Sequence, residues 1–125
     1  MPTIVCGVAF AGFSGAHLID EFVWGAPSEF HLTVAATEIL ALAYMIALVG
    51  LVASAATGRP KGYLGLAVAG GLISLADILK HGPDIVAPGP WRFPVISGFL
   101  AVGLTVSGVC TAVSALLAWR LSRRP

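Results

Sequence analysis

Long apolar segments alternate with short polar breaks along this chain. A hydrocarbon core about 30 Å thick needs about 20 apolar residues per helix, and four segments qualify. We expect helices over about 3–24, 32–56, 63–80 and 93–121. The intervening stretches GAPSE, TGRPKG and HGPDIVAPGPWRFP hold the Gly and Pro residues that end helices. The pattern predicts an all-α fold, an integral membrane bundle of four transmembrane helices that forms a single domain over residues 1–125.

The composition strengthens the membrane assignment. Of the 125 residues, 58% are hydrophobic and 10% are charged, whereas soluble domains have about 45–50% apolar and about 25% charged residues. The net charge of +1 provides no general basic surface for nucleic acid. We therefore expect a multi-pass membrane protein whose partner is the lipid bilayer and which binds no nucleic acid.

Basic residues are distributed unequally between the two ends of the predicted bundle. Five of the seven lie between the second and third helices or at and beyond the end of the fourth: Arg59, Lys61, Arg120, Arg123 and Arg124. The opposite end has only Lys80 and Arg92. Because cytoplasmic loops carry an excess of Lys and Arg, both termini are predicted to be cytoplasmic.

Four of the six acidic residues fall within predicted helices: Asp20, Glu21, Glu38 and Asp77. A carboxylate in the bilayer costs roughly 2.5–3.5 kcal/mol even on the lenient insertion scale. At about 1.5 Å of rise per residue, His17, Glu38 and Asp77 all fall in the non-cytoplasmic half of the bilayer. The shared depth indicates a polar interior, a cavity or a proton path.

The first helix gathers polar side chains on one side. His17, Glu21 and Trp24 lie at i, i+4 and i+7, and Asp20 is i+3 from His17, so that these residues share a face. Trp24 either caps a pocket or belongs to the aromatic belt at the membrane interface. Asp20 and Glu21 are interfacial if the helix ends early. A separate alternative for His17 is a structural hydrogen bond between helices.

The second and third helices complete the predicted pocket. Ser74, Asp77 and His81 share one side of the third helix at i, i+3 and i+7, and Met45 continues the stripe of Glu38 on the second. Acidic groups at the mouth and apolar walls beneath suit a lipid-like ligand with one polar end. The alternative for Asp77 is a structural ion pair with Lys80, three residues later.

A metal site for iron or manganese at His17, Glu21, Glu38 and Asp77 is an alternative interpretation of these residues. No cofactor and no metal ion are expected, however. Metal sites in helix bundles use a repeated Glu-x-x-His motif, and the spacing here is the single His-x-x-x-Glu of His17 and Glu21. The sequence also lacks a Gly-rich phosphate loop, a GxGxxG pattern, a nucleophile elbow and a thiol pair.

Three stretches resemble the EXPERA family of membrane proteins, which includes a sterol isomerase and a sigma-2-type receptor. They are HLIDEFVWG with His17 and Glu21, LTVAATEILA with Glu38, and VAGGLISLADILKHG with Asp77. The resemblance covers about Ala16 to His81. It implies that His17, Glu21 and Glu38 transfer protons at a double bond and that Asp77 supports them. The Asn and aromatic residue of the family's last helix have no counterpart in FPVISGFLAVGLTVSGVCTAVSALL.

The residues and the resemblance together predict a membrane-embedded isomerase or cyclase for a sterol or terpenoid-like alkene. Glu38, expected to be the most enclosed carboxylate, is the candidate acid, and Glu21 beside His17 is the candidate base. The expected substrate-binding residues are Asp77, Ser74, Trp24, Met45 and Asp20. The alternatives are a non-catalytic binding protein for amphipathic or cationic ligands and a small transporter. The hydrophobic ligand is the expected small-molecule partner, and a homodimer is left open.

Overall fold

The structure, a computed structural model, describes residues 2–23, 27, 31–86 and 95–123. These residues form four long helices: α1 (Pro2–Val23), α3 (Val34–Ala56), α4 (Pro60–Val86) and α5 (Val95–Leu121). The described part of the chain contains no strand. Each helix is long and apolar enough to cross a membrane. The predicted all-α four-helix fold is therefore confirmed.

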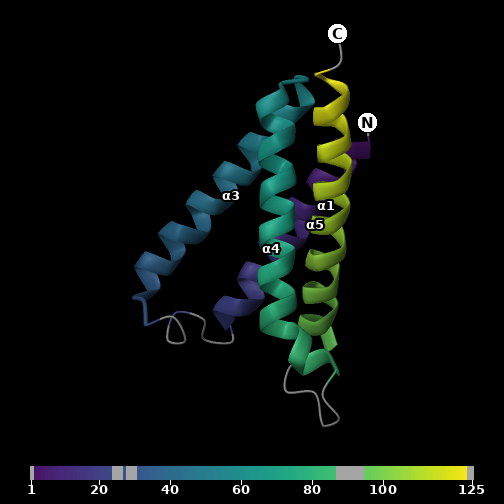
Figure 1. Cartoon of the computed structure of the whole chain (residues 1–125). Coiled ribbons are helices and arrows are strands. Elements are labelled where there is room, and N and C mark those ends of the chain that lie inside the picture. Colours follow the sequence, from purple (N-terminus) through teal and green to yellow (C-terminus); the bar gives the residue numbers. More distant parts are fainter. Residues whose placement is uncertain (1, 24–26, 28–30, 87–94, 124–125) are drawn as a thin grey trace.

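The helices pack unequally (Figure 1). The yellow-green α5 lies beside α4 in the most extensive helix pair, and α1 crosses behind them, whereas α3 diverges from α4 towards its own N-terminal end. The hydroxyl of Thr3 donates to the carbonyl of Ser114, 3.1 Å away, which ties the start of α1 to the last part of α5. The two ends of the described chain therefore lie in the same half of the bundle. Their cytoplasmic location stays a prediction.

Local sequence determines where the middle helices begin. Thr33 caps α3, because its hydroxyl accepts a hydrogen bond from the backbone N–H of Ala36 at 3.2 Å. Gly58, with φ of 75°, allows the tight turn between α3 and α4. Pro60 is the first residue of α4, a position where its missing N–H is harmless. Gly58 and Pro60 thus separate the two helices as predicted, but α4 begins at Pro60 and not at the expected Tyr63.

The predicted end of the third helix at Lys80 is wrong. Helix α4 continues to Val86 and contains Pro83. One internal proline removes one hydrogen bond and crowds the carbonyl four residues earlier, which bends or weakens a helix without always ending it. The extra turns matter for the site, because they make His81 helical and place it one turn beyond Asp77.

The helices make close contact where small residues meet. The buried core consists of Phe10, Leu48, Ala55, Leu66, Leu104 and Ala115. Beside it, α4 and α5 approach at Gly70 and Gly108, where a Cβ added to Gly70 would lie 2.5 Å from the carbonyl oxygen of Gly108. Such contact between backbones is how small residues stabilise helix pairs in membranes. It holds α4 and α5 in the register that the site requires.

Candidate functional site

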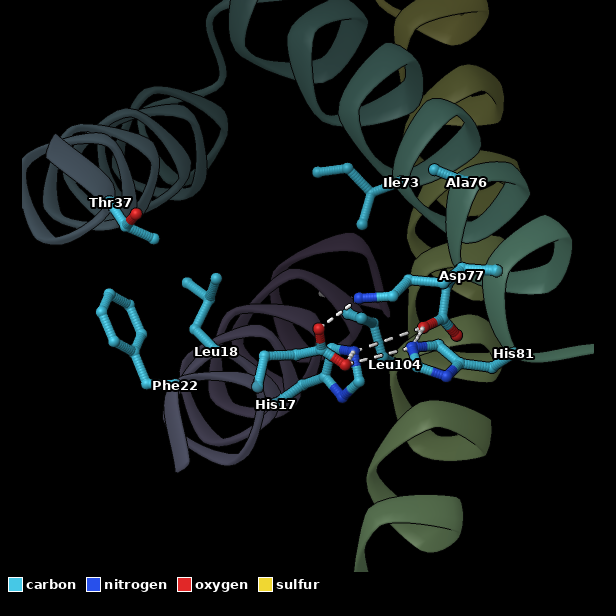
Figure 2. A pocket seen from close by; sticks show the side chains of 11 residues that line it. His17, Leu18, Phe22, Thr37, Ile73, Ala76, Asp77, His81 and Leu104 are labelled. Carbon is cyan, nitrogen blue, oxygen red and sulfur yellow. Dashed lines mark hydrogen bonds and ion pairs between the residues drawn. The ribbon is translucent and has the colours of Figure 1, made fainter. Parts of the chain in front are cut away.

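A cluster of ionisable side chains lies between α1, α4 and α5. Helix α1 supplies His17 and Glu21, and α4 supplies Asp77, Lys80 and His81 (Figure 2). The spacing is four residues within each helix, from His17 to Glu21 and from Asp77 to His81, so each pair lies on one helix face. His17, Asp77 and His81 are buried. We call these five residues the His–carboxylate cluster.

Asp77 lies at the centre of the His–carboxylate cluster. Its Oδ1 is 3.6 Å from Nε2 of His17 and 3.8 Å from Nε2 of His81. The two imidazole rings meet edge to face, with centroids 5.1 Å apart. Two histidines from different helices thus present ring nitrogens to one carboxylate oxygen.

Glu21 connects the histidines to a cation. Its Oε1 lies 3.7 Å from Nε2 of His17 and 3.4 Å from Nε2 of His81. Its Oε2 accepts a hydrogen bond from Nζ of Lys80. The Lys80 side chain is 34% exposed, whereas that of Glu21 is 19% exposed. Lys80 therefore links the buried groups to the surface of the bundle.

Helix α5 orients Asp77 from the other side. The hydroxyl of Thr105 donates to Oδ2 of Asp77 at 2.5 Å, and the hydroxyl of Ser74 donates to the Thr105 carbonyl at 3.1 Å. The other oxygen, Oδ1, is buried and has no hydrogen bond within the described part of the chain. Asp77 is therefore fixed by one oxygen and presents the other to the two histidines.

A pocket opens beside the His–carboxylate cluster. Its cavity of about 260 Å³ lies between α1, α3, α4 and α5. The lining residues are His17, Leu18, Glu21, Phe22, Thr37, Ile73, Ala76, Asp77, Lys80, His81 and Leu104. Figure 2 shows Thr37 of α3 on the side opposite the cluster, with Phe22 on the same side as Thr37 and Leu18 between Thr37 and the cluster. One end of the pocket is thus polar and the rest of its wall is mostly apolar.

The structure brings together half of the predicted site residues: His17, Glu21, Asp77 and Ser74. His17, Glu21 and Asp77 all line the pocket. Ser74 is buried one turn before Asp77, and its hydroxyl donates to the backbone carbonyl of Thr105, the residue whose hydroxyl bonds Asp77. Lys80, which was considered as a partner of Asp77, is bonded to Glu21 on the neighbouring helix.

The expectation that Glu38 is the most enclosed carboxylate is wrong. Its side chain is exposed, and it is not among the residues that line the pocket. Glu38 lies near the start of α3, in the part of the helix that diverges from α4 (Figure 1). Its neighbour Thr37 faces the pocket instead. The apolar residues around Glu38 contact the surroundings of the bundle, and Ile39 is 67% exposed.

Two other predicted binding residues, Met45 and Asp20, do not line the pocket. Met45 packs on α1, where its Cε would be 3.3 Å from a Cβ added to Gly15. Asp20 is partly exposed and does not line the pocket. Trp24 falls outside the described residues.

Two further members of the site, Lys80 and Thr105, were not selected as site residues. His81 had been placed on the face of Asp77 but was given no role. The sequence feature that could have identified His81 and Lys80 is their position one turn after Asp77. The helix that carries them continues further than predicted. The only sequence feature that marks Thr105 is a hydroxyl group within an apolar helix.

A second polar contact joins α1 to α3 and leads to a stability prediction. The hydroxyl of Tyr44 donates to Oγ of the buried Ser14 at 2.9 Å. We expect Tyr44→Phe to lower the free energy of unfolding by about 0.5–1.5 kcal/mol, the usual net value of one hydrogen bond. Reversible unfolding in mixed micelles measures it. Ser14→Ala is the matched change, and strictly additive effects in the double variant would contradict the contact.

Comparison of the chain with protein-family models, with curated proteins and with solved structures gave no match. The functional argument therefore depends on the chemistry of the pocket and of the His–carboxylate cluster.

Proposed function

We propose that the protein binds a lipid-like molecule in the pocket and moves one of its double bonds by proton transfer. The observation that carries this proposal is the junction of an apolar cavity with the His–carboxylate cluster. Ionisable groups inside a membrane protein usually mark a site where a ligand, an ion or a proton is handled. An apolar pocket with a few convergent polar groups is the common form of a small-molecule site.

The size of the cavity favours partial enclosure of the ligand. At about 260 Å³, the cavity is smaller than the roughly 300–1,000 Å³ of pockets that enclose a drug-sized molecule. A lipid-like ligand would place one end against the cluster, between Leu18, Phe22 and Ile73. The remainder would extend along the diverging α3 towards the lipid.

Glu21 is the group we assign to proton transfer. It lines the pocket, and its other oxygen is bonded to the partly exposed Lys80, so a proton can pass from solvent through Lys80 to Glu21. Protonated Glu21 would give its proton to one alkene carbon, and the carboxylate would remove a proton from the carbon on the far side of the cation. The double bond moves, and no proton is gained or lost overall.

Asp77, the other carboxylate of the cluster, stabilises the positive charge that develops during this reaction. A carbocation intermediate forms when the alkene is protonated, and fixed negative charge nearby lowers its energy. Asp77 is held for this role by Thr105 and lies at the same end of the pocket. The EXPERA resemblance of the stretch from Ala16 to His81 supports a proton-transfer function, although the structure leads us to replace Glu38 by Asp77 in the active set.

Filling the pocket tests whether a ligand binds there. Ala76 lines the pocket, and we expect Ala76→Trp to remove any lipid-like molecule that co-purifies with the wild-type protein. The bulky indole would occupy the cavity without disturbing the buried core, because Ala76 is exposed. Native mass spectrometry of the protein released from micelles measures the bound mass.

Leu75→Trp is the matched control, because Leu75 precedes Ala76 on α4, is 54% exposed and does not line the pocket. This variant should keep the ligand. Equal ligand content in Ala76→Trp and Leu75→Trp would exclude the pocket as the binding site.

A further inference from the structure

We propose that His17, Asp77 and His81 hold a divalent first-row transition-metal ion of the zinc class. One ligand atom from each residue lies within 4.8 Å of the ligand atoms of the other two. The three residues come from two helices and are all buried. Two imidazoles and one carboxylate form a ligand set used by both zinc and non-haem iron sites.

The distances suit a shared ion better than direct contact. Oδ1 of Asp77 lies 3.6 and 3.8 Å from the two histidine nitrogens, beyond the about 2.7–3.2 Å of an N–H···O hydrogen bond. Two ligands on one tetrahedral zinc ion, each about 2.0–2.1 Å from the metal, are separated by about 3.3–3.4 Å. Shifts of a few tenths of an ångström would bring both histidine nitrogens to this separation from Asp77, and the ligand atoms of His17 and His81 lie within 4.8 Å of each other.

A buried oxygen that lacks a hydrogen bond in the described part of the chain, Oδ1 of Asp77, also indicates a cation at this position. Oδ1 of Asp77 has no hydrogen bond within the described residues, and the Asp77 side chain is only 4% exposed. A buried carboxylate oxygen without a partner is costly, and a bound cation removes that cost. The second oxygen is bonded to Thr105, which is how outer residues orient a metal-ligating carboxylate.

The spacing along α4 supports this arrangement. Asp77 and His81 lie at i and i+4 on one helix face, the same separation as the two histidines of the zinc motif H-E-x-x-H. His17 approaches from α1 and completes the set. The metal site weighed from the sequence combined His17, Glu21, Glu38 and Asp77; the ligand set proposed here keeps His17 and Asp77 and adds His81.

The charge of the surroundings favours a single divalent ion. The two carboxylates of the cluster, Asp77 and Glu21, carry its negative charge, because imidazoles bind metals in their neutral form and add no charge. The hydrogen bond from Lys80 offsets part of the negative charge of Glu21. Glu21 is therefore left as a proton-transfer group beside the ion. The metal proposal depends on the three ligand residues alone. A bound divalent ion would offset the negative charge of Asp77, so in the ion-loaded protein Asp77 is a metal ligand and no longer the group that stabilises a carbocation. The two proposals are therefore tested separately.

Cobalt titration tests this proposal directly. The full chain, purified without a polyhistidine tag and stripped with chelator, is titrated with Co²⁺, whose visible absorption reports coordination by protein. We expect one Co²⁺ per chain, displaced by one equivalent of Zn²⁺. His17→Asn and Asp77→Asn should each weaken binding at least tenfold, since even loss of an outer-sphere partner costs about 10–100-fold.

His31→Asn is the matched control, because His31 is exposed and lies outside the cluster; its ion affinity should equal that of the wild type. Lys80→Gln should tighten binding, because it removes a positive charge and releases Glu21 as a fourth ligand. X-ray absorption of the zinc-loaded wild type should show imidazole ligands, and this measurement needs no variant to fold.

Two outcomes would overturn the proposal: no Co²⁺ band in the wild type, or equal affinity in His17→Asn and the wild type. Double-bond movement in a chain that binds no ion would reject the metal site and leave the proposed function intact. Binding of one ion by a chain that moves no double bond would reject the proposed function and leave the metal site intact.

Discussion

Glu21→Gln is expected to slow deuterium transfer from D₂O to the pocket ligand by at least about 100-fold, the lower range for loss of a general acid–base group. Glutamine has nearly the same shape and its carbonyl can still accept from Lys80, so the fold and the pocket should persist. It cannot carry the proton. We therefore expect the rate to fall while the content of bound ligand, measured by native mass spectrometry, is unchanged.

The matched control is Glu38→Gln, the same chemical change at an exposed carboxylate that does not line the pocket. Its rate should stay within about twofold of the wild type, because surface changes away from a site have small effects. If Glu38→Gln lost activity and Glu21→Gln kept it, the assignment derived from the structure would be wrong, and the EXPERA-based role of Glu38 would be restored.

Gly70→Ala is expected to lower the free energy of unfolding by about 1–3 kcal/mol, as overpacking does in other cores. The added Cβ would lie 2.5 Å from the carbonyl oxygen of Gly108 and 3.1 Å from the backbone nitrogen of Ala112. Backbone atoms cannot rotate away, so α4 and α5 must separate. The separation would also disturb the hydrogen bond from Thr105 to Asp77.

Gly71→Ala is the adjacent control. An added Cβ there meets nothing within 4 Å, and alanine is favoured over glycine in helices by up to about 1 kcal/mol. Reversible unfolding of both variants in mixed micelles should give opposite signs. Equal stability of Gly70→Ala and Gly71→Ala would mean that α4 and α5 do not pack at this point.

The number of helices and part of the site could be predicted from the sequence. Long apolar runs define transmembrane helices because the bilayer sets their length. His17 and Glu21 could be placed together because residues four apart lie on one face of a helix. Asp77 could be added because the rise per residue gives its depth in the bilayer, which matches that of His17. These are properties of single helices and of their order along the chain.

The rotation of each helix about its axis could not be predicted. Apolar residues surround Glu38 on α3, so hydrophobicity does not mark which side of that helix faces the bundle. The structure exposes Glu38 and turns Thr37 towards the pocket, because α3 diverges from its neighbours at this end. Thr105 was missed for a related reason: its contact with Asp77 depends on the register of α4 against α5 at Gly70 and Gly108.

The most direct test of the proposed function uses the wild-type protein and a lipid-like molecule identified in extracts of the purified protein. That molecule is incubated with the protein in D₂O, extracted and analysed by mass spectrometry and deuterium NMR. We expect deuterium bonded to carbon next to a double bond that has moved, and none after incubation with Glu21→Gln. A ligand that is recovered unchanged, without deuterium on any carbon, would contradict proton transfer and leave a binding protein.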